Sequence, residues 1–404
     1  MIELTTEQQA AVTMALKSKA SVLTGGPGTG KTTTCKEIIN RLSSKGATLS
    51  LCAPSGKASK RLSEATGRPA TTIHKLLEAS VFSADEFEFN RGSMLPLESN
   101  YIIVDETSMV ANDLMADLLR AVDANKTSIL FVGDQDQLPS IGPGACLRDM
   151  LASKAIPHTE LTIIHRNSGD IVKACHQIKH GQTYMPSEIL APETGQNLRH
   201  IEVKRPQEIL NTIKTLVCDR LPQRGYNPIW DIQVISPTNT RTAISCSAIN
   251  KVLQAELNPN PEVDGTIFRV GDKVINTKNK AYDDSYIVNG DIGQVLDING
   301  KYLTVKFFDP DRIVDISKTD NHLLLAYAIT GHRAQGSEFP VVIIPVHSSF
   351  SFIMNRSWIY TAISRSRDIC ITTGQFYAIE TAIGKEVVST RVTRLKEKLV
   401  SSSY

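Results

Sequence analysis

The feature that most restricts the fold of this chain is the stretch "LTGGPGTGKTTT" at residues 23–34. It follows an apolar run, "SVLT", and opens a helical pattern, so it joins a strand to a helix. From Gly25 to Thr32 it fits the pattern G-x-x-x-x-G-K-[ST] of the phosphate-binding loop. We therefore expect an α/β fold with a parallel sheet and a site for a nucleoside triphosphate.

The chemistry of this loop follows from its residue types. Glycines let backbone N–H groups face the phosphates without a Cβ in the way, and the helix start adds positive dipole. Lys31 is expected to reach the β- and γ-phosphates, and the Thr32 hydroxyl to bind Mg²⁺. ATP and Mg²⁺ are the predicted cofactors. The predicted nucleotide-binding residues here are Gly26, Pro27, Gly28, Thr29, Gly30, Lys31, Thr32 and Thr33.

Two further apolar runs end in polar groups suited to the same chemistry. "YIIV" ends in Asp105 and Glu106. Asp105 is predicted to hold Mg²⁺, directly or through water, and Glu106 to orient or deprotonate the attacking water. "SILFV" leads to Asp134 and Gln137. Gln137 is a candidate sensor of the γ-phosphate, whereas Asp134 is as readily a turn or capping residue.

Phosphoryl transfer also needs positive charge at the transition state. The candidates are Arg166 and Arg365, both far along the chain from the loop, and each can equally be a solvated surface charge. If both reach the γ-phosphate, ATP binds in a cleft between two domains that hydrolysis opens and closes. Gln8, upstream of the first strand, has an amide that can pair with adenine N6 and N7, but alone it is an ordinary surface glutamine.

The pattern of strands and helices predicts two α/β domains, residues 1–164 and 165–404. Residues 79–99 break the rhythm of the first domain and are expected to form a hairpin that turns at "NRGS". Residues from about 262 to 325 read as short strands joined by Gly, Asn and Asp turns, the pattern of a small antiparallel barrel. The second domain is thus predicted to carry a β-barrel insertion.

Composition narrows the class of protein. No apolar run approaches the roughly 18–20 residues that span a bilayer, and the polar N-terminus does not resemble a signal peptide. The seven cysteines include no C-x-x-C pair, which argues against zinc or a disulfide framework and favours reduced thiols in a cytoplasm. A net charge of +2 neither requires nor excludes nucleic acid.

The order of the motifs resembles that of superfamily 1 helicases, specifically the RecD-like group that translocates 5′ to 3′. The resemblance runs from Gln8 to Arg367. The matching motifs are "LTTEQ", "GGPGTGKTTT", "APSGKASKRL", "TIHKLL", "IIVDETSMV", "GDQDQLPSIGPG", "LTIIHR", "AYAITGHRAQGSEFP" and "YTAISRSR".

The resemblance implies two RecA-like parallel-sheet domains, with a duplex-splitting β-hairpin inserted in the first and an SH3-like β-barrel in the second. In the ATP site it implies an adenine contact for Gln8 and coupling of the γ-phosphate to DNA for Gln137. Arg166 and Arg365 become the arginine fingers. Gly336 and Glu338 approach the nucleotide from the second domain.

The resemblance also places single-stranded DNA across the strand-end loops of both domains, where polar groups suit phosphate and sugar. Phe87 or Phe89 would stack on a base at the fork. The resemblance implies DNA contacts for His74 and His332 as well, although alone they would suggest structural histidines. The other implied contacts are Pro54, Ser55, Lys57, Thr72 and Lys75 in the first domain, and Thr238, Asn239, Arg333 and Gln335 in the second.

Three positions depart from the family pattern. Ser55 replaces a threonine, Ser140 replaces a proline, and Gly331 replaces a larger residue, which is expected to loosen its loop. None removes a catalytic group. The sequence also begins directly at the adenine motif, so a bare motor core is expected.

The predicted function is an ATP-dependent 5′-to-3′ translocase on single-stranded DNA that unwinds duplexes. One alternative is a translocase that displaces proteins or remodels forks with little unwinding. A second is a DNA-binding module without hydrolysis, which the intact catalytic groups disfavour. RNA is a lesser alternative as the track. The expected partners are single-stranded DNA, single/double-strand junctions, and single-stranded-DNA-binding, replication or recombination proteins. A monomer without membrane contact is expected, in the cytoplasm of a bacterial or phage-infected cell.

Overall fold

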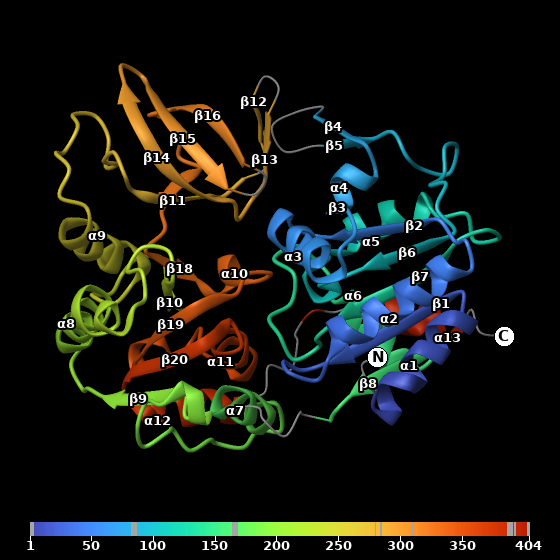
Figure 1. Cartoon of the computed structure of the whole chain (residues 1–404), viewed down its shortest axis with the longest axis horizontal. Coiled ribbons are helices and arrows are strands. Elements are labelled where there is room, and N and C mark those ends of the chain that lie inside the picture. The colour runs from blue at the N-terminus through green and yellow to red at the C-terminus, as the bar shows by residue number, and fades with distance from the viewer. Residues whose placement is uncertain are drawn as a thin grey trace. The chain divides into compact units, whose positions relative to one another are not determined.

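The computed structural model divides into two compact units (Figure 1). Unit 1 comprises Met1–Arg166 and Val388–Tyr404, and unit 2 comprises Asn167–Val387. The predicted domain bounds, 1–164 and 165–404, stay predictions. The structure describes residues 4–81, 87–163, 169–278, 280–282, 285–308, 311–385, 391 and 393–401.

Unit 1 is built on a six-stranded parallel sheet with the order β3-β2-β6-β7-β1-β8. Its strands are β1 (Ala20–Gly25), β2 (Leu49–Ala53), β3 (Ala70–Thr72), β6 (Tyr101–Val104), β7 (Ser128–Gly133) and β8 (His158–Leu161). Its helices are α1 (Thr6–Lys17), α2 (Lys31–Ser44), α3 (Gly56–Thr66), α4 (Ile73–Leu76), α5 (Asn112–Arg120), α6 (Cys146–Ser153) and α13 (Leu395–Ser401).

The central strands are apolar throughout because both faces of this sheet are covered. Alternate residues of one strand enter different cores: Val22 packs with α5 and α6, and Leu23 packs with α1 and α2. All these strands run in one direction, so their carboxyl ends meet at one edge. The phosphate loop after β1 and the polar residues after β6 and β7 therefore lie at that edge.

The insertion in unit 1 is a hairpin of β4 (Ala79–Val81) and β5 (Phe87–Phe89), but the predicted position of its turn is wrong. Ala79 pairs with Phe89, so the chain turns between the two strands and before "NRGS". Arg91, within "NRGS", donates to the Glu78 carboxylate at 2.8 Å, and Gly92 bridges to Leu95 in a separate tight turn.

Unit 2 has a five-stranded parallel sheet with the order β18-β10-β19-β20-β9. Its strands are β9 (Leu198–Glu202), β10 (Ile232–Ser236), β18 (Ala328–Thr330), β19 (Phe339–Val346) and β20 (Ser366–Gly374). Its helices are α7 (Asp170–Lys179), α8 (Pro206–Thr215), α9 (Cys246–Leu257), α10 (Gly331–Ala334), α11 (Arg356–Ile363) and α12 (Phe376–Gly384). Across the described ranges, no helix has the length and apolar character needed to cross a bilayer.

The insertion in unit 2 is a five-stranded antiparallel sheet, as predicted, with the order β16-β15-β14-β11-β17 and its own apolar core. A buried carboxylate attaches it to α9, because Asp272 accepts from Gln254 at 2.6 Å and from Asn258 at 2.7 Å. The strands are β11 (Lys273–Asn276), β14 (Ile292–Asn299), β15 (Tyr302–Phe308), β16 (Asp311–Ser317) and β17 (Leu323–Leu325), with a small hairpin of β12 (Lys280–Tyr282) and β13 (Ser285–Ile287).

Candidate functional site

The phosphate loop connects β1 to α2 and is closed by its own residues. Gly28 and Gly30 have φ of +74° and +87°, the left-handed region that glycine enters without strain. Lys31 Nζ donates to the carbonyls of Gly25 at 2.5 Å and Gly26 at 2.9 Å, so its ammonium lies across the loop. Phosphate oxygens are stronger acceptors for an ammonium than neutral carbonyls, so a bound nucleotide can replace these contacts.

Gln8 lies beneath this loop and is buried. Its Nε2 donates to the Thr29 carbonyl at 3.2 Å, and its Oε1 accepts from the Thr5 backbone at 3.0 Å. The second bond belongs to a capping box that starts α1, so Gln8 ties this helix to the phosphate loop. The adenine contact stays a prediction, and it would have to replace one of these bonds.

Glu7, which the sequence reasoning missed, fixes the segment after β8. It accepts hydrogen bonds from the backbones of Thr162 at 2.7 Å and Ile163 at 3.1 Å. Burial alone would raise the pKa of Glu7, but these bonds outweigh it and lower the pKa. The predicted finger Arg166 follows this segment and lies outside the described residues, so its role stays a prediction.

Asp105 and Glu106 follow β6 directly. The backbone N–H of Glu106 donates to Asp105 Oδ1 at 2.9 Å, which holds the two carboxylates side by side. Burial and the charge of Glu106 raise the pKa of Asp105 from 3.8 to about 6, although Arg61 and Lys31 oppose the rise. Glu106 has φ of +50°, a left-handed conformation that costs a non-glycine residue on the order of 1–3 kcal/mol. Such strain at a strand end is typical of a functional site.

Arg61 of α3 is a second residue that the sequence reasoning missed. Its Nη1 lies 3.9 Å from Glu106 Oε1, and its side chain is partly exposed, so the pair contributes little stability. Its effect is local, because its positive charge opposes the rise in the pKa of the neighbouring Asp105.

The raised pKa of Asp105 predicts a pH-dependent stability. The folded chain binds this proton below about pH 6 and the unfolded chain only below 3.8, so the contribution of Asp105 to stability becomes more favourable as the pH falls through 6. With divalent metal removed, Asp105→Asn should raise the Tm at pH 7.5 by about 2–4 °C and by clearly less at pH 5. Thermal unfolding of both proteins at both pH values checks this. An equal shift at the two values would contradict it.

Gln137 follows β7 and carries an unusual buried acceptor. Asp134 Oδ1 accepts from the Asp136 backbone at 3.1 Å, and Asp134 Oδ2 accepts from Gln137 Nε2 at 3.4 Å. Asp134 is therefore a turn residue that also orients Gln137. Gln137 Oε1 is buried and has no donor among the described residues. Leaving such an oxygen unpaired costs about 1–3 kcal/mol, so it indicates a position for water or ligand.

In unit 2, Arg365 lies beneath the loop that carries Gly336 and Glu338. Only 2% of Arg365 is exposed, and within the described part of the chain its partners are neutral oxygens. These are the Thr361 carbonyl at 3.2 Å, the Ser337 carbonyl at 3.4 Å and the Ser364 hydroxyl at 3.4 Å. The structure thus brings together three residues of unit 2 that were predicted to approach the nucleotide.

The DNA contacts predicted in unit 1 lie after β2 and β3. Ser55 caps α3 by accepting from the Ala58 backbone at 3.3 Å, and Thr72 caps α4 by accepting from the Lys75 backbone at 3.1 Å. Both hydroxyls therefore have structural roles. Pro54 and Lys57 flank Ser55 and are half-buried.

His74 and Phe89 lie together in the same unit, with ring centroids 5.9 Å apart. Burial lowers the pKa of His74, and Asp117 opposes this effect. The Phe89 ring is partly buried against the core, so only part of it is available to a base. The side chain of Phe87 lies outside the described residues.

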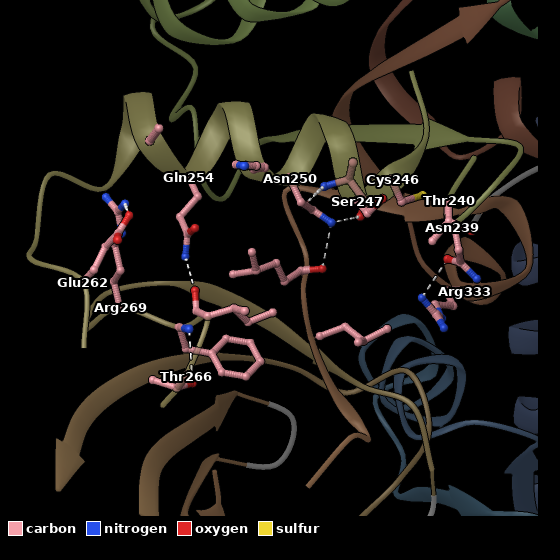
Figure 2. Close-up of a pocket in the computed structure, with 17 residues that line it drawn as sticks. Asn239, Thr240, Cys246, Ser247, Asn250, Gln254, Glu262, Thr266, Arg269 and Arg333 are labelled. Atoms are coloured by element: carbon pink, nitrogen blue, oxygen red, sulfur yellow. Dashed lines mark hydrogen bonds and ion pairs between the residues drawn. The ribbon is translucent and has the colours of Figure 1, made fainter. Parts of the chain in front are cut away.

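The DNA contacts predicted in unit 2 reach a pocket of about 680 Å³ beside α9. Figure 2 shows Asn239 and Arg333 facing each other at one end of it, and Arg333 Nη1 donates to Asn239 Oδ1 at 3.2 Å. Burial lowers the pKa of Arg333. Of the other predicted contacts, Thr238 and His332 are half-buried, whereas Gln335 is buried.

The expected loosening at Gly331 is wrong. A Cβ at this position would lie 2.8 Å from Trp358 Nε1, so the indole of Trp358 occupies the space of the missing side chain. Trp358 is buried, and this packing keeps the loop tight.

Comparisons with known families agree with this architecture. Residues 3–198 match the AAA domain family, and residues 325–371 match the UvrD-like helicase C-terminal domain. Residues 249–307 match the SH3 domain of ATP-dependent RecD-like DNA helicases, which confirms the predicted SH3-like insertion.

Several relatives align with nearly the whole chain, among them two bacterial proteins. The ATP-dependent RecD2 DNA helicase of Deinococcus radiodurans is 34% identical over 97% of this chain, which spans about half (52%) of that protein. The RecBCD enzyme subunit RecD of Mycolicibacterium smegmatis is 30% identical, again over 97% of this chain and over 74% of its own length.

The solved structure of Bacteroides Pif1 bound to single-stranded DNA has a similar fold. It superposes with a TM-score of 0.55 at 20% identity, covering 92% of each chain. This likeness confirms two RecA-like domains. With the matches above, it follows that the chain belongs to the RecD-like group of superfamily 1 DNA helicases.

Proposed function

We propose that this chain is the ATP-dependent motor of a DNA helicase that moves 5′ to 3′ along single-stranded DNA and unwinds duplexes. The observation that carries the proposal lies at one edge of unit 1. Lys31, the Asp105–Glu106 pair and Gln137 follow the neighbouring strands β1, β6 and β7 there. Gln137 Oε1 is buried and has no donor among the described residues. A nucleotide-binding module without hydrolysis would need neither a strained carboxylate nor an unpaired buried acceptor. A strained carboxylate at a strand end and a buried acceptor without a described donor support a site that binds and orients a water molecule.

The residues of unit 1 divide the chemistry among them. Lys31 binds the β- and γ-phosphates once it leaves the loop carbonyls. Glu106 accepts a proton from the attacking water or orients it, and Gln137 Oε1 accepts a hydrogen bond from the same water. Thr32 and Asp105 would hold Mg²⁺, which would supply positive charge at the phosphates. Burial and the charge of Glu106 raise the pKa of Asp105, and a cation at this buried carboxylate would offset both effects.

Arg166 and Arg365 complete this proposal as sources of positive charge at the transition state. Arg365 supports the role because it is buried as a cation without a carboxylate partner among the described residues. Burial of a charge without an opposite charge is costly, so a charge that is kept there supports a functional role for Arg365.

The track is proposed from the relatives, and the 5′-to-3′ direction from the resemblance of the motifs to the RecD-like group. The Deinococcus protein is named a DNA helicase, and the Bacteroides structure holds single-stranded DNA. A translocase that displaces proteins with little unwinding is the weaker alternative, because a hairpin is present where a duplex-splitting element is expected. Forked DNA is the proposed substrate, and the proposed place of action is a bacterial or phage-infected cytoplasm, where the seven free cysteines stay reduced.

A polarity-resolved unwinding assay tests the proposal. With ATP and Mg²⁺, a duplex with a 5′ single-stranded tail should be separated, and duplexes with a 3′ tail or no tail should stay intact. ATP turnover should rise with DNA oligonucleotides and less with RNA of the same sequence. Separation of only the 3′-tailed duplex would overturn the polarity, and turnover without any separation would favour the alternative.

A further inference from the structure

The segment Arg391–Ser401, here called the strap, returns to the ATP-binding unit after the last helix of unit 2. Helix α12 ends at Gly384 in unit 2, whereas α13 of the strap packs against α6 of unit 1 (Figure 1). Leu395 and Leu399 of α13 are partly buried against the core that contains Met150. The strap is therefore a built part of unit 1.

Arg391, at the start of the strap, donates hydrogen bonds to the loop that follows Gln137. Its Nη1 donates to the carbonyls of Gly142 at 2.9 Å and Gly144 at 2.8 Å, and its Nη2 donates to the carbonyl of Ser140 at 2.7 Å. Nη1 also lies 3.3 Å from Ser140 Oγ. The planar guanidinium fork can serve several acceptors in fixed directions, which an ammonium does not do. Ser140 is one of the positions that depart from the family pattern.

A second contact fixes the strap beside Arg391. Thr393 Oγ1 donates to Asp149 of α6, a carboxylate that is 4% exposed. The other oxygen of Asp149 accepts from Arg148 Nε at 3.0 Å and Nη2 at 2.8 Å. Arg148 Nη2 also donates to the Arg391 carbonyl at 3.5 Å. Side chains of α6 thus hold the strap in the position that aims Arg391 at the loop.

The loop held by Arg391, residues 140–144, is connected to both Gln137 and the segment that follows Glu106. Ser140 is three residues after Gln137, and the Pro143 carbonyl accepts from the Asn112 backbone at 2.9 Å. Asn112 starts α5, the helix that follows Glu106 through a short 3₁₀ turn, Thr107–Met109. The loop is therefore tied to the carboxylate segment at one point and to Arg391 at three carbonyls.

We propose that Arg391 is a positioning residue for ATP hydrolysis. By holding Ser140, Gly142 and Gly144, it fixes the segment that starts at Gln137, and so keeps Gln137 Oε1 where the attacking water binds. This inference rests on the proposed ATPase function and adds to it a residue outside the helicase motifs. Its action is indirect, because Arg391 contacts the loop and not the nucleotide.

The test compares Arg391→Ala with Arg394→Ala, an exposed arginine three positions later on the strap. Since misplacement of a catalytic group by about 1 Å can cost 10²-fold, Arg391→Ala should lower the DNA-stimulated kcat by about 10-fold or more. The KM for ATP should stay within about twofold, because the phosphate loop is untouched. Arg391→Lys should restore only part of the rate. Arg394→Ala should match wild type.

Two further measurements separate positioning from stability. In a Gln137→Ala background, Arg391→Ala should add little further loss, because both changes act on one group. Hydrogen exchange of the peptide that contains residues 134–146 should quicken in Arg391→Ala and not in Arg394→Ala. Full additivity with Gln137→Ala, or unchanged exchange, would overturn the inference. Wild-type turnover in Arg391→Ala would overturn the inference about Arg391 and leave the proposed function standing. Absence of DNA-stimulated turnover in the wild-type chain would overturn the proposed function itself.

Discussion

Glu106→Gln should reduce the DNA-stimulated ATPase rate by about 10²–10⁴-fold while ATP and DNA still bind. The amide keeps the size of the side chain and the left-handed backbone of residue 106, but it cannot accept a proton from water. Lys31, Thr32 and the loop glycines are unchanged, so phosphate binding should persist. Single-turnover hydrolysis and equilibrium binding of a fluorescent ATP analogue measure the two effects separately.

The control for this change is Glu64→Gln, which alters an exposed carboxylate on α3 of the same unit. It should leave turnover within about twofold, because exposed pairs contribute little. If Glu106→Gln kept full turnover, Glu106 would have no role in activating water. Loss of ATP binding together with turnover would instead indicate that the change disturbs the neighbouring Asp105.

The central strands of both units were predictable because they are buried on both faces. "YIIV" and "VVIIPV" are apolar throughout, and a continuous apolar run of this length is typical of a strand buried on both faces. Edge strands were harder. β9, "LRHIE", buries only its first residue, and β8, "HTEL", buries only its last, so neither has an apolar run to detect. Polar edge strands of this kind discourage pairing with other chains, and the same polar residues remove the apolar run by which a strand is predicted from sequence.

In the site, residues that act together with their neighbours in the sequence were predictable, and residues with distant partners were not. The phosphate loop and Asp105–Glu106 were predictable because each works through neighbours in the sequence. Arg91 shows how a local pattern fails. "NRGS" resembles a turn, but Arg91 instead donates to Glu78, which lies just before the first strand of the hairpin. Arg391 had no local signal, since its partner Ser140 is 251 residues away. Only the folded chain brings such pairs together.

Arg365→Met should lower the DNA-stimulated kcat by about 10³-fold or more without lowering thermal stability. Loss of an arginine finger removes positive charge from the transition state, so the rate falls while ATP binding to the phosphate loop remains. The stability should behave differently. Arg365 is a buried cation whose three described partners are neutral oxygens, and an apolar side chain of similar length avoids the cost of burying that charge.

The matched control is Arg367→Met, two residues later, because this guanidinium is mostly exposed and pairs with Asp368 at 3.0 Å. It should change turnover by no more than about twofold, as expected for a surface pair. For Arg365→Met, the Tm should lie at or above the wild-type value. A large fall in Tm with turnover preserved would make Arg365 a structural residue of unit 2. A large fall in turnover at an unchanged or raised Tm would identify Arg365 as a charge that unit 2 keeps buried for ATP hydrolysis and not for its own stability.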